Sequence, residues 1–584
     1  MPGLTLRASL SALALCAFAA ACSDGGAGNR AGKDDGADVP DSLKYGGTVT
    51  IGAYGDLQSM NALTSSDNNS NSIQREVLFM PLVKYNEKIE PVPWLAERFD
   101  TVRVAGDSLE LTFHLRRDVK WHDGKPTTAR DVDFTYRRAI DPQTAFPNAS
   151  AFDYYARQGT LVDEYTWKIR LRPHSEFLDI WYQTPVMPEH ILGSVPASQL
   201  INHPFGTDRP VGNGPFRFVR RIPNQEWVFE ANPDFPEALG GRPYIDRLVY
   251  RFVPEQTTLL TELMTGRVDV YLGPNPESAE RIRQHPSLDL VVSPFRQWVW
   301  IGWNTRLPMF SDARVRRALT MGINRREIVD ALLYGYGDVG RSTITPAHWS
   351  YDTTDARTLL PYDTAQASRL LTEAGWIDRN NDGVRENAQG QPFRFELKTN
   401  KGNEVREDIT EIVQAQLKPL GIDVQPRVVE WNTLIEQLQG SLGAGGRRTR
   451  DVEAVVSAWV DYFRKDDKDV LHCTNLEKPY QYVGYCNERA SQLIDTLGVI
   501  MDRQAAAPLW REYQHLMVQE SPYTVIYYPK RLTGVAKRLN GEVMDIRGEF
   551  NTVARWWIHP SQRRAGGAAR PAAAAPAATD TGKK

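Results

Sequence analysis

The sequence has few cysteines, no excess of one charge and no apolar run long enough to cross a membrane. Only four of its 584 residues are cysteines, which excludes a small disulfide-stapled scaffold. The 69 basic and 72 acidic residues nearly cancel, so nothing favours nucleic acid as a partner. The sequence also lacks the G-x-S-x-G, H-E-x-x-H and phosphate-loop patterns, and its histidines form no cluster. We therefore expect no catalytic residues, no cofactor and no ATP hydrolysis.

The first residues have the pattern of an export signal. A single cation, Arg7, precedes the apolar run 8–21, which is shorter than the ~20 residues that span a bilayer. Small residues then precede Cys22. This pattern resembles the site at which a signal peptidase cuts just before a cysteine that then carries lipid, although Ala19 stands where leucine is usual. We expect residues 1–21 to be a removable signal and Cys22 to carry lipid. The alternative is cleavage at an Ala-X-Ala site and secretion without lipid.

Two flanking segments have compositions that cannot form a core. Residues 22–45 are rich in Gly and Asp with few large apolar side chains, and residues 563–584 are mostly Ala, Gly and Pro. Such segments bury too little surface to offset the loss of chain entropy. The sequence therefore predicts a flexible lipoprotein tether at 22–45 and a disordered tail at 563–584.

Two further cysteines, Cys473 and Cys486, lie close together in the sequence. An exported protein meets an oxidising environment, and a bridge would stabilise the fold by about 3 kcal/mol in the loop-entropy model. His472 beside Cys473 leaves a metal site as the alternative, but no further zinc-ligand spacing follows. A disulfide is the prediction.

The central part of the chain is too long for a single core, because such cores stop growing beyond ~250–300 residues. Residues 108–115 alternate apolar and polar as in a strand, and 128–140 have helical spacing behind a threonine cap. Strand and helix patterns alternate from residue 393 onward, with strands expected at 393–399 and 424–429 and helices at 405–420 and 432–438, which predicts an α/β lobe. Other predicted helices are 257–268, 312–321, 325–333, 364–374, 490–500 and 505–519, and other predicted strands are 46–54, a hairpin in 214–230, and 523–528.

Eight segments of the chain carry a family resemblance. They are PVPWLAERFD (91–100), LTFHLRRDVKWHDGKPTTARDVDFTY (111–136), VGNGPFRFV (211–219) with EANPDF (230–235), LMTGRVDVYLGP (263–274), WNTRLPMFSDARVRRALTMGINRREIV (303–329), TAQASRLLTEAGW (364–376), LKPLGIDVQPRVVEW (417–431) and GYCNERASQLIDT (484–496). In this order they resemble the extracellular solute-binding proteins of ABC importers, family 5, the class that includes oligopeptide- and dipeptide-binding proteins.

The resemblance implies an α/β, two-lobed periplasmic binding protein fold that closes over its ligand. The implied limits are 46–54, 211–302 and 524–562 for lobe I, 55–210 for a subdomain inserted in lobe I, and 303–523 for lobe II. The chain would then cross between the lobes near Gly302-Trp303 and 523–529.

The resemblance also implies a non-enzymatic role in import. The chain would capture a solute, with a small peptide as the expected ligand, and deliver it to the permease and ATPase subunits. We expect a monomer in the periplasm, held to a membrane by its lipid alone. The alternatives are a ligand such as an oligosaccharide or a metal chelate, or a different class, namely a secreted hydrolase or a sensing or chaperone protein.

Candidate ligand-binding residues follow from matching positions. The family motif Gly-Trp-x-Ala-Asp-Tyr, whose aspartate holds a peptide's ammonium, resembles residues 457–467 (SAWVDYFRKDD), where the spacing is one residue shorter and Ala458 replaces glycine. Asp466 or Asp467 could serve instead of Asp461, and Asp461 could be a solvated loop acid. The candidates are Trp459, Asp461 and Tyr462, with Trp431 as a pocket wall or core residue, and Gly52, Ala53 and Tyr54 through main-chain groups.

One acidic turn imitates a calcium loop. Asp378, Asn380 and Asp382 supply oxygens at positions 1, 3 and 5, and Gly383 stands at position 6. The twelfth position is Gln389, where a bidentate glutamate belongs. We therefore predict a polar turn and no metal site, with calcium binding as the alternative. The glycine-rich run 440–446 lacks the residues of a phosphate loop and is predicted to be a mobile loop.

Overall fold

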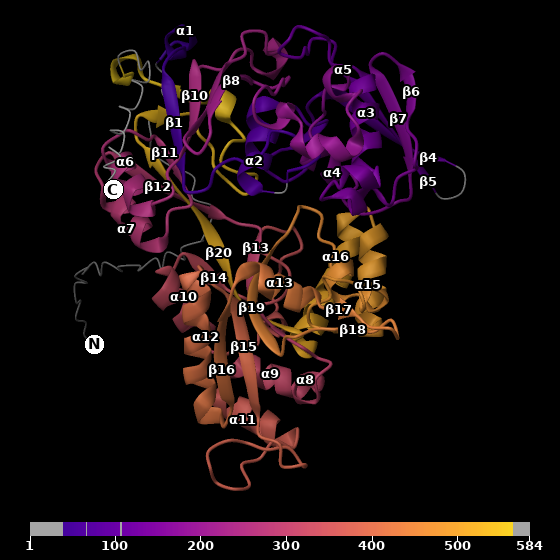
Figure 1. Cartoon of the computed structure of the whole chain (residues 1–584), viewed down its shortest axis with the longest axis vertical. Helices are drawn as coiled ribbons and strands as arrows, with labels where there is room; N and C mark the ends of the chain where they lie inside the picture. The colour runs from indigo at the N-terminus through magenta and orange to yellow at the C-terminus, as the bar shows by residue number, and fades with distance from the viewer. Residues whose placement is uncertain (1–38, 66, 105–107, 565–584) are drawn as a thin grey trace, which may run out of the picture.

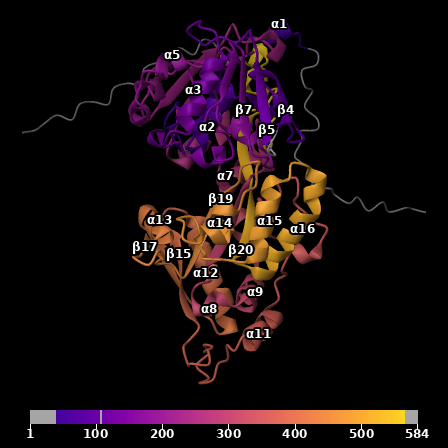
Figure 2. The ribbon, with the colours of Figure 1, turned by 90° about the vertical axis from the view of Figure 1, so that its right-hand side faces the viewer.

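A computed structural model describes residues 39–65, 67–104 and 108–564. The predicted signal, the predicted lipid attachment at Cys22, the first part of the predicted tether and nearly all of the predicted tail lie outside these residues. The described chain forms two lobes, one above the other in Figure 1, and Figure 2 shows the same division from the side. We refer to the upper one as lobe I and the lower one as lobe II. The expected two-lobed α/β architecture is confirmed.

One mixed sheet runs through both lobes in the order β16-β15-β19-β13-β20-β11-β1-β10-β9-β8, with β12 and β14 also paired to β20. β1 lies between two parallel neighbours, β10 and β11. The lobe I strands are β1 (Thr48–Ala53), β8 (Phe216–Ile222), β9 (Glu226–Ala231), β10 (Arg247–Phe252), β11 (Val270–Leu272) and β12 (Leu288–Pro294); those of lobe II are β13 (Gln297–Trp303), β14 (Gly337–Val339), β15 (Arg394–Asn400), β16 (Asp423–Val429) and β19 (Ala454–Val460).

The strand β20 (Tyr523–Ala536) belongs to both lobes. Its first half pairs with β13 and β14, and its second half pairs with β11 and β12. The chain passes from lobe I to lobe II at Phe295-Arg296, between the end of β12 at Pro294 and the start of β13 at Gln297. The first crossing therefore precedes the expected Gly302-Trp303, because β13 pairs along its whole length with β19 of lobe II.

Lobe I carries a second sheet, ordered β4-β5-β7-β6, within the expected insertion. In β5 (Ser108–Leu115) every second side chain is buried, as the alternation predicts. The helix α3 (Ala129–Ala139) begins with a capping box between Thr128 and Asp131, which satisfies main-chain N–H groups at its start. The other strands of this sheet are β4 (Ala96–Val104), β6 (Thr160–Asp163) and β7 (Thr166–Leu171).

Lobe II is built from helices that cover its strands. Most helices begin at a side-chain cap, for example Asp363 before α11 and Asn403 before α12. The predicted helices in this lobe are all confirmed within a few residues. They are α9 (Ala313–Gly322), α10 (Arg325–Leu333), α11 (Thr364–Glu373), α12 (Glu404–Leu417), α13 (Trp431–Gln439), α15 (Glu488–Val499) and α16 (Arg503–Glu520).

The remaining elements are short. The run 440–446 is not only a loop, since it contributes to a small hairpin of β17 (Ser441–Leu442) and β18 (Arg448–Thr449). The others are α1 (Asp41–Lys44), α2 (Asn68–Ile73), α4 (Asp179–Gln183), α5 (Glu189–Leu192), α6 (Gln256–Met264), α7 (Pro276–Gln284), α8 (Pro308–Ser311), α14 (Lys468–Leu471), β2 (Val83–Tyr85), β3 (Pro91–Pro93), β21 (Leu539–Asn540) and β22 (Trp557–Ile558).

The structure also answers two questions raised by the sequence, the state of two cysteines and the presence of membrane-spanning helices. Cys473 and Cys486 are joined by a disulfide, with their Cα atoms 4.7 Å apart, so these sulfurs do not hold a metal. Across the described ranges, none of the helices combines the length and the apolar character needed to cross a membrane.

Candidate functional site

A cavity of about 770 Å³ lies where the two lobes meet. Its walls come from segments far apart in sequence that the shared sheet brings together. Lobe I contributes Ala53 and Tyr54 at the end of β1, lobe II contributes Asp461 and Tyr462 after β19, and the crossings contribute 295–297 and 529–532. Ligands commonly bind in such crevices between lobes.

Asp461 is held at the cavity by the end of β19. Its main-chain N–H donates to the carbonyl of Arg296 (2.7 Å), which fixes it beside the crossing. Its Oδ1 accepts from Trp298 Nε1 (3.2 Å) and Lys465 Nζ (3.0 Å). Its Oδ2 is buried and has no hydrogen-bond partner among the described residues. The residue is therefore not a solvated loop acid, and one carboxylate oxygen is left to receive a donor.

The charges behind Asp461 leave an excess of negative charge. Lys465 lies between two carboxylates, 3.0 Å from Asp461 and 2.9 Å from Asp467. Burial raises the pKa of Asp461, while the Lys465 ammonium opposes that shift. Burial alone would lower the pKa of Lys465, but the two carboxylates raise it above its ordinary value. One ammonium facing two carboxylates leaves the group favourable to a further cation.

The other two candidate acids are placed differently. Asp467 is buried and accepts from Tyr513 OH (2.6 Å) and Thr343 Oγ1 (3.2 Å), away from the cavity wall. Asp466 pairs with Arg464 at 2.8 Å and lines a second cavity. Of the three acids, Asp461 alone lines the cavity at the crossings.

Arg296 is the principal lining residue that the sequence did not reveal. Its guanidinium is buried over the ring of Phe463, 4.4 Å from the centroid, and its Nε and Nη1 have no hydrogen-bond partner in the described ranges. Burial lowers the pKa of Arg296, and the Tyr182 and Asp179 side chains partly oppose this. Such donors can bind a carboxylate or a carbonyl.

The cavity as a whole offers both signs of charge. Its cationic lining residues are Arg75, Arg296, Arg406, Lys530, Arg531 and Arg547, and its acidic ones are Asp56, Asp67, Asp461 and Glu549. Some of these already form pairs, as Arg531 does with Glu549 at 3.3 Å. The arrangement suits a ligand that carries a positive group and several oxygen acceptors.

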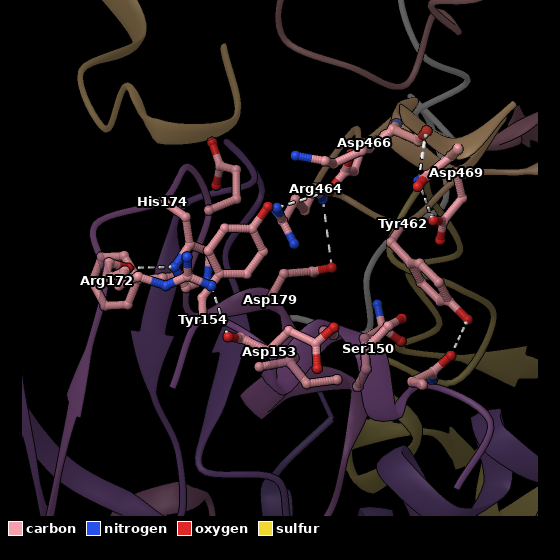
Figure 3. Close-up of a pocket in the computed structure, with 18 of the residues that line it drawn as sticks. Ser150, Asp153, Tyr154, Arg172, His174, Asp179, Tyr462, Arg464, Asp466 and Asp469 are labelled. Atoms are coloured by element: carbon pink, nitrogen blue, oxygen red, sulfur yellow. Dashed lines mark hydrogen bonds and ion pairs between the residues drawn. The ribbon is translucent and has the colours of Figure 1, made fainter. Parts of the chain in front are cut away.

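A second cavity of about 560 Å³ adjoins the first and also lies between the lobes (Figure 3). Asn148, Gln183 and Tyr462 line both cavities. The hydroxyl of Tyr462 donates to Asn148 Oδ1 at 2.9 Å, so this contact lies where the two cavities adjoin. A long ligand that displaces Tyr462 would reach both.

The second cavity has a stacked wall in Figure 3. The rings of Tyr154 and His174 stack with their centroids 4.4 Å apart. The Arg464 guanidinium also lies over the Tyr154 ring, 4.8 Å from its centroid. Burial lowers the pKa of His174 to about 4, so the imidazole is neutral at neutral pH. Burial raises the pKa of Asp179, whose carboxylate faces the main-chain N–H of Arg464. Aromatic and charged side chains therefore line this second cavity.

The structure brings four of the seven candidates to the main cavity, namely Ala53, Tyr54, Asp461 and Tyr462. The other three lie elsewhere. Gly52 pairs with strands on both sides and faces α6. Trp459 stacks between Trp300 and Tyr482. Trp431 is 46% exposed at the start of α13 and lines neither of the two large cavities.

Two lobes joined by two crossings, with a charged cavity between them, define a solute-binding protein of the two-lobed class. Residues 90–475 match the family of bacterial extracellular solute-binding proteins, family 5 Middle. The chain belongs to this family and is the solute-binding component of an ABC import system.

Relatives and a solved structure support this placement. The oligopeptide-binding protein AppA of Bacillus subtilis is 31% identical over 549 residues, which cover 94% of this chain and 97% of AppA. Di/tripeptide-binding protein 2 of Pseudomonas aeruginosa is 27% identical over 481 residues, 77% of this chain and 83% of that protein. The structure of Bacillus subtilis AppA in complex with a nonapeptide has a TM-score of 0.73 and 30% identity, and covers 88% of this chain and 99% of that one.

Proposed function

We propose that this protein captures peptides in the cavity between its lobes and hands them to a membrane permease. The observation that carries the proposal is Asp461, which lines the cavity and whose buried Oδ2 has no hydrogen-bond partner among the described residues, beside a carboxylate-rich group with a single ammonium. A peptide's α-ammonium supplies the missing donor and charge. The unpaired donors of Arg296 suit peptide carbonyls or a terminal carboxylate.

Capture follows from the geometry of the crossings. A ligand that contacts Ala53 and Tyr54 on lobe I and Asp461 and Tyr462 on lobe II binds the closed form better than the open one. Shifting a 1:99 preference to 99:1 takes ~5.5 kcal/mol of differential affinity. Two charged contacts, each worth about 1.5–3 kcal/mol, supply much of this.

We further propose the following organisation. Residues 46–54, 211–296 and 530–562 form lobe I with the insertion 55–210, and 297–529 form lobe II, a division supported by the strand pairing. The protein acts as a non-enzymatic, periplasmic monomer held to a membrane by lipid on Cys22. Its partners are the permease and ATPase subunits of the importer.

The test is isothermal titration calorimetry with short synthetic peptides and their N-acetylated forms. We expect the free-amine peptide to bind wild type, and acetylation or Asp461→Asn to weaken binding roughly tenfold to a hundredfold, since a charge-assisted hydrogen bond is lost. In Asp461→Asn, acetylation should have little further effect. The control Asp330→Asn, at an exposed acid on α10 that lines neither cavity, should bind as wild type does. Binding of oligosaccharides or metal chelates alone, or indifference to acetylation, would contradict the proposal.

A further inference from the structure

A pair of main-chain hydrogen bonds closes the loop between α11 and β15 at its base. Ile377 and Glu386 exchange main-chain hydrogen bonds of 3.0 Å each, so residues 378–385 form the tip. Asn381 (φ 60°) and Gly383 (φ 90°) adopt left-handed backbone, which folds the tip back. α11 lies at the end of lobe II that is remote from lobe I in Figure 1, so this loop is separate from the cavity between the lobes.

Three carboxylates converge inside this loop. Ligand oxygens of Asp378, Asp382 and Glu386 all lie within 4.8 Å of one another. Glu386 is only 6% exposed, and its Oε1 has no hydrogen-bond partner among the described residues. Asp378 Oδ1 is likewise buried without a partner there. The other oxygens of these two residues are held by main-chain N–H groups of Arg379 (2.9 Å) and Gly383 (3.0 Å), which aims the free oxygens inward.

The two nearby arginines direct their hydrogen bonds to other acceptors, although Arg385 interacts electrostatically with Asp378. Arg379 donates to the main-chain carbonyls of Glu386 (2.6 Å) and Asn387 (3.0 Å). Arg385 donates to the carbonyl of Leu420 (2.7 Å) and to Ser368. Within the described part of the chain, none of the three carboxylates forms an ion pair with a cationic side chain. Asp382 is exposed and accepts from Val384 N (2.8 Å) and Asn380 Nδ2 (3.0 Å), whereas the buried oxygens of Asp378 and Glu386 have no partner there. Carboxylates at this spacing repel one another unless a cation joins them.

We propose that this loop binds Ca²⁺ through Asp378 Oδ1, a carboxylate oxygen of Asp382 and Glu386 Oε1. Oxygens that each lie ~2.3–2.6 Å from one ion are at most ~5 Å apart, which the observed separations satisfy. The donors are all oxygens, which favours a hard cation over a transition metal. A loop without preset octahedral geometry favours Ca²⁺ over Mg²⁺.

The site differs from the twelve-residue pattern on which the polar-turn prediction rested. The acid at the ninth position, Glu386, takes the place of the absent acid at the twelfth, because its pairing with Ile377 turns it into the loop. Gln389 instead belongs to the next turn, where its N–H donates to Asn387 Oδ1 at 3.0 Å. Asn380 Oδ1, which accepts from Asp382 N (2.9 Å), stands at the third position, where such loops use a side-chain oxygen.

The test is calorimetric titration of chelator-stripped full-length protein with CaCl₂ and, separately, MgCl₂. We expect saturable Ca²⁺ binding, weaker Mg²⁺ binding, and a melting temperature that rises with CaCl₂. Glu386→Gln keeps an acceptor for Arg379 N but loses a charge, and should weaken Ca²⁺ binding at least tenfold. Asp382→Asn, at an exposed position that tolerates change, should do the same. Glu411→Gln, an exposed acid on α12, is the matched control and should bind as wild type.

Three outcomes would overturn the proposal. They are no saturable Ca²⁺ response of the wild type up to about 5 mM, beyond the range of extracellular calcium modules; unchanged binding in Asp382→Asn; or equal affinity for Mg²⁺. Peptide affinity is measured on the same variants and is expected to stay at the wild-type value, so the calcium and peptide proposals are tested separately.

Discussion

Gly52 occupies a place in β1 that leaves no room for a side chain. A Cβ atom there would lie 2.4 Å from Leu259 Cδ1 and 2.9 Å from Val268 Cγ1, while hydrogen-bonded strands flank it on both sides. The glycine therefore lets α6 approach the sheet. Its role is in packing rather than in contact with the ligand.

Gly52→Ala should lower the free energy of unfolding by about 1–3 kcal/mol, because the added methyl overpacks the contact with α6. Urea denaturation of the purified protein measures this. Gly55→Ala is the control, since its Cβ would meet only Asn69 Nδ2 at an ordinary 3.5 Å. A loss of peptide affinity in Gly52→Ala with unchanged stability would instead support a direct main-chain contact with the ligand.

The site residues show which signals a sequence carries. Asp461 and Tyr462 were predictable because they follow a strand in a recognisable order, although the spacing departs from the family's motif. Arg296 was not predictable, because its position in the cavity depends on residues far away in the sequence. Its guanidinium is buried over Phe463, and its carbonyl accepts from the main-chain N–H of Asp461. Trp459 looked like a ligand contact, but its neighbours Trp300 and Tyr482 come from distant segments and take its ring into an aromatic stack.

At the scale of elements, the disulfide ties two segments of lobe II. Cys473 begins a short 3₁₀ turn, and Cys486 stands just before the Asn487 cap of α15. The bridged cysteines are 13 residues apart. Closing a loop of this size removes unfolded-state entropy worth about 3 kcal/mol in the chain-entropy model. The bridge therefore stabilises the packing of α15 on the rest of the lobe.

Replacing both cysteines by serine should lower the free energy of unfolding by about 3 kcal/mol. The measurement is chemical denaturation of the two proteins with and without a reductant. Cys486 is exposed, so a reductant should bring the wild type to the stability of the double variant and leave the variant unchanged. Equal stability of wild type and variant under oxidising conditions would contradict a stabilising bridge.

Helices were the elements best predicted from sequence, because caps such as Asp363 and Asn403 mark where they begin. The crossing was placed too late. Residues 288–303 are strand-like nearly throughout, and β12 and β13 pair with successive parts of β20, so only the added pairing of β13 with β19 separates the two strands. That pairing is a tertiary property, so no local pattern reveals the break at Phe295-Arg296.

At the scale of the whole molecule, several contacts join the lobes outside the shared sheet. Arg503 at the start of α16 pairs with Glu176 of lobe I at 2.9 Å. Near it, the main-chain N–H of Ser175 donates to the carbonyl of Gly498 at 2.8 Å. Figures 1 and 2 both show α15 and α16 beneath lobe I. These contacts join the lobes directly, so they stabilise the arrangement in which the lobes meet.

Arg503→Gln should therefore shift the protein toward the open form. We expect peptide affinity to fall about threefold to fivefold, as for the loss of ~1 kcal/mol of closing free energy. Small-angle X-ray scattering of the ligand-free variant should show a larger radius of gyration. The control is Arg489→Gln, which breaks the pair with Glu512 (2.7 Å) inside lobe II. Equal effects of the two changes would contradict a role in closure.

The passage of β20 through both lobes has a consequence for the entropy of capture. Two separate proteins that close around a peptide lose several kcal/mol of translational and rotational freedom. Here the lobes belong to one chain and share one hydrogen-bonded sheet, so each lobe is present at a high effective concentration near the other. The free energy of a peptide's contacts therefore does not have to offset the cost of bringing two separate bodies together, and release requires that the two crossings flex and that the contacts between the lobes break.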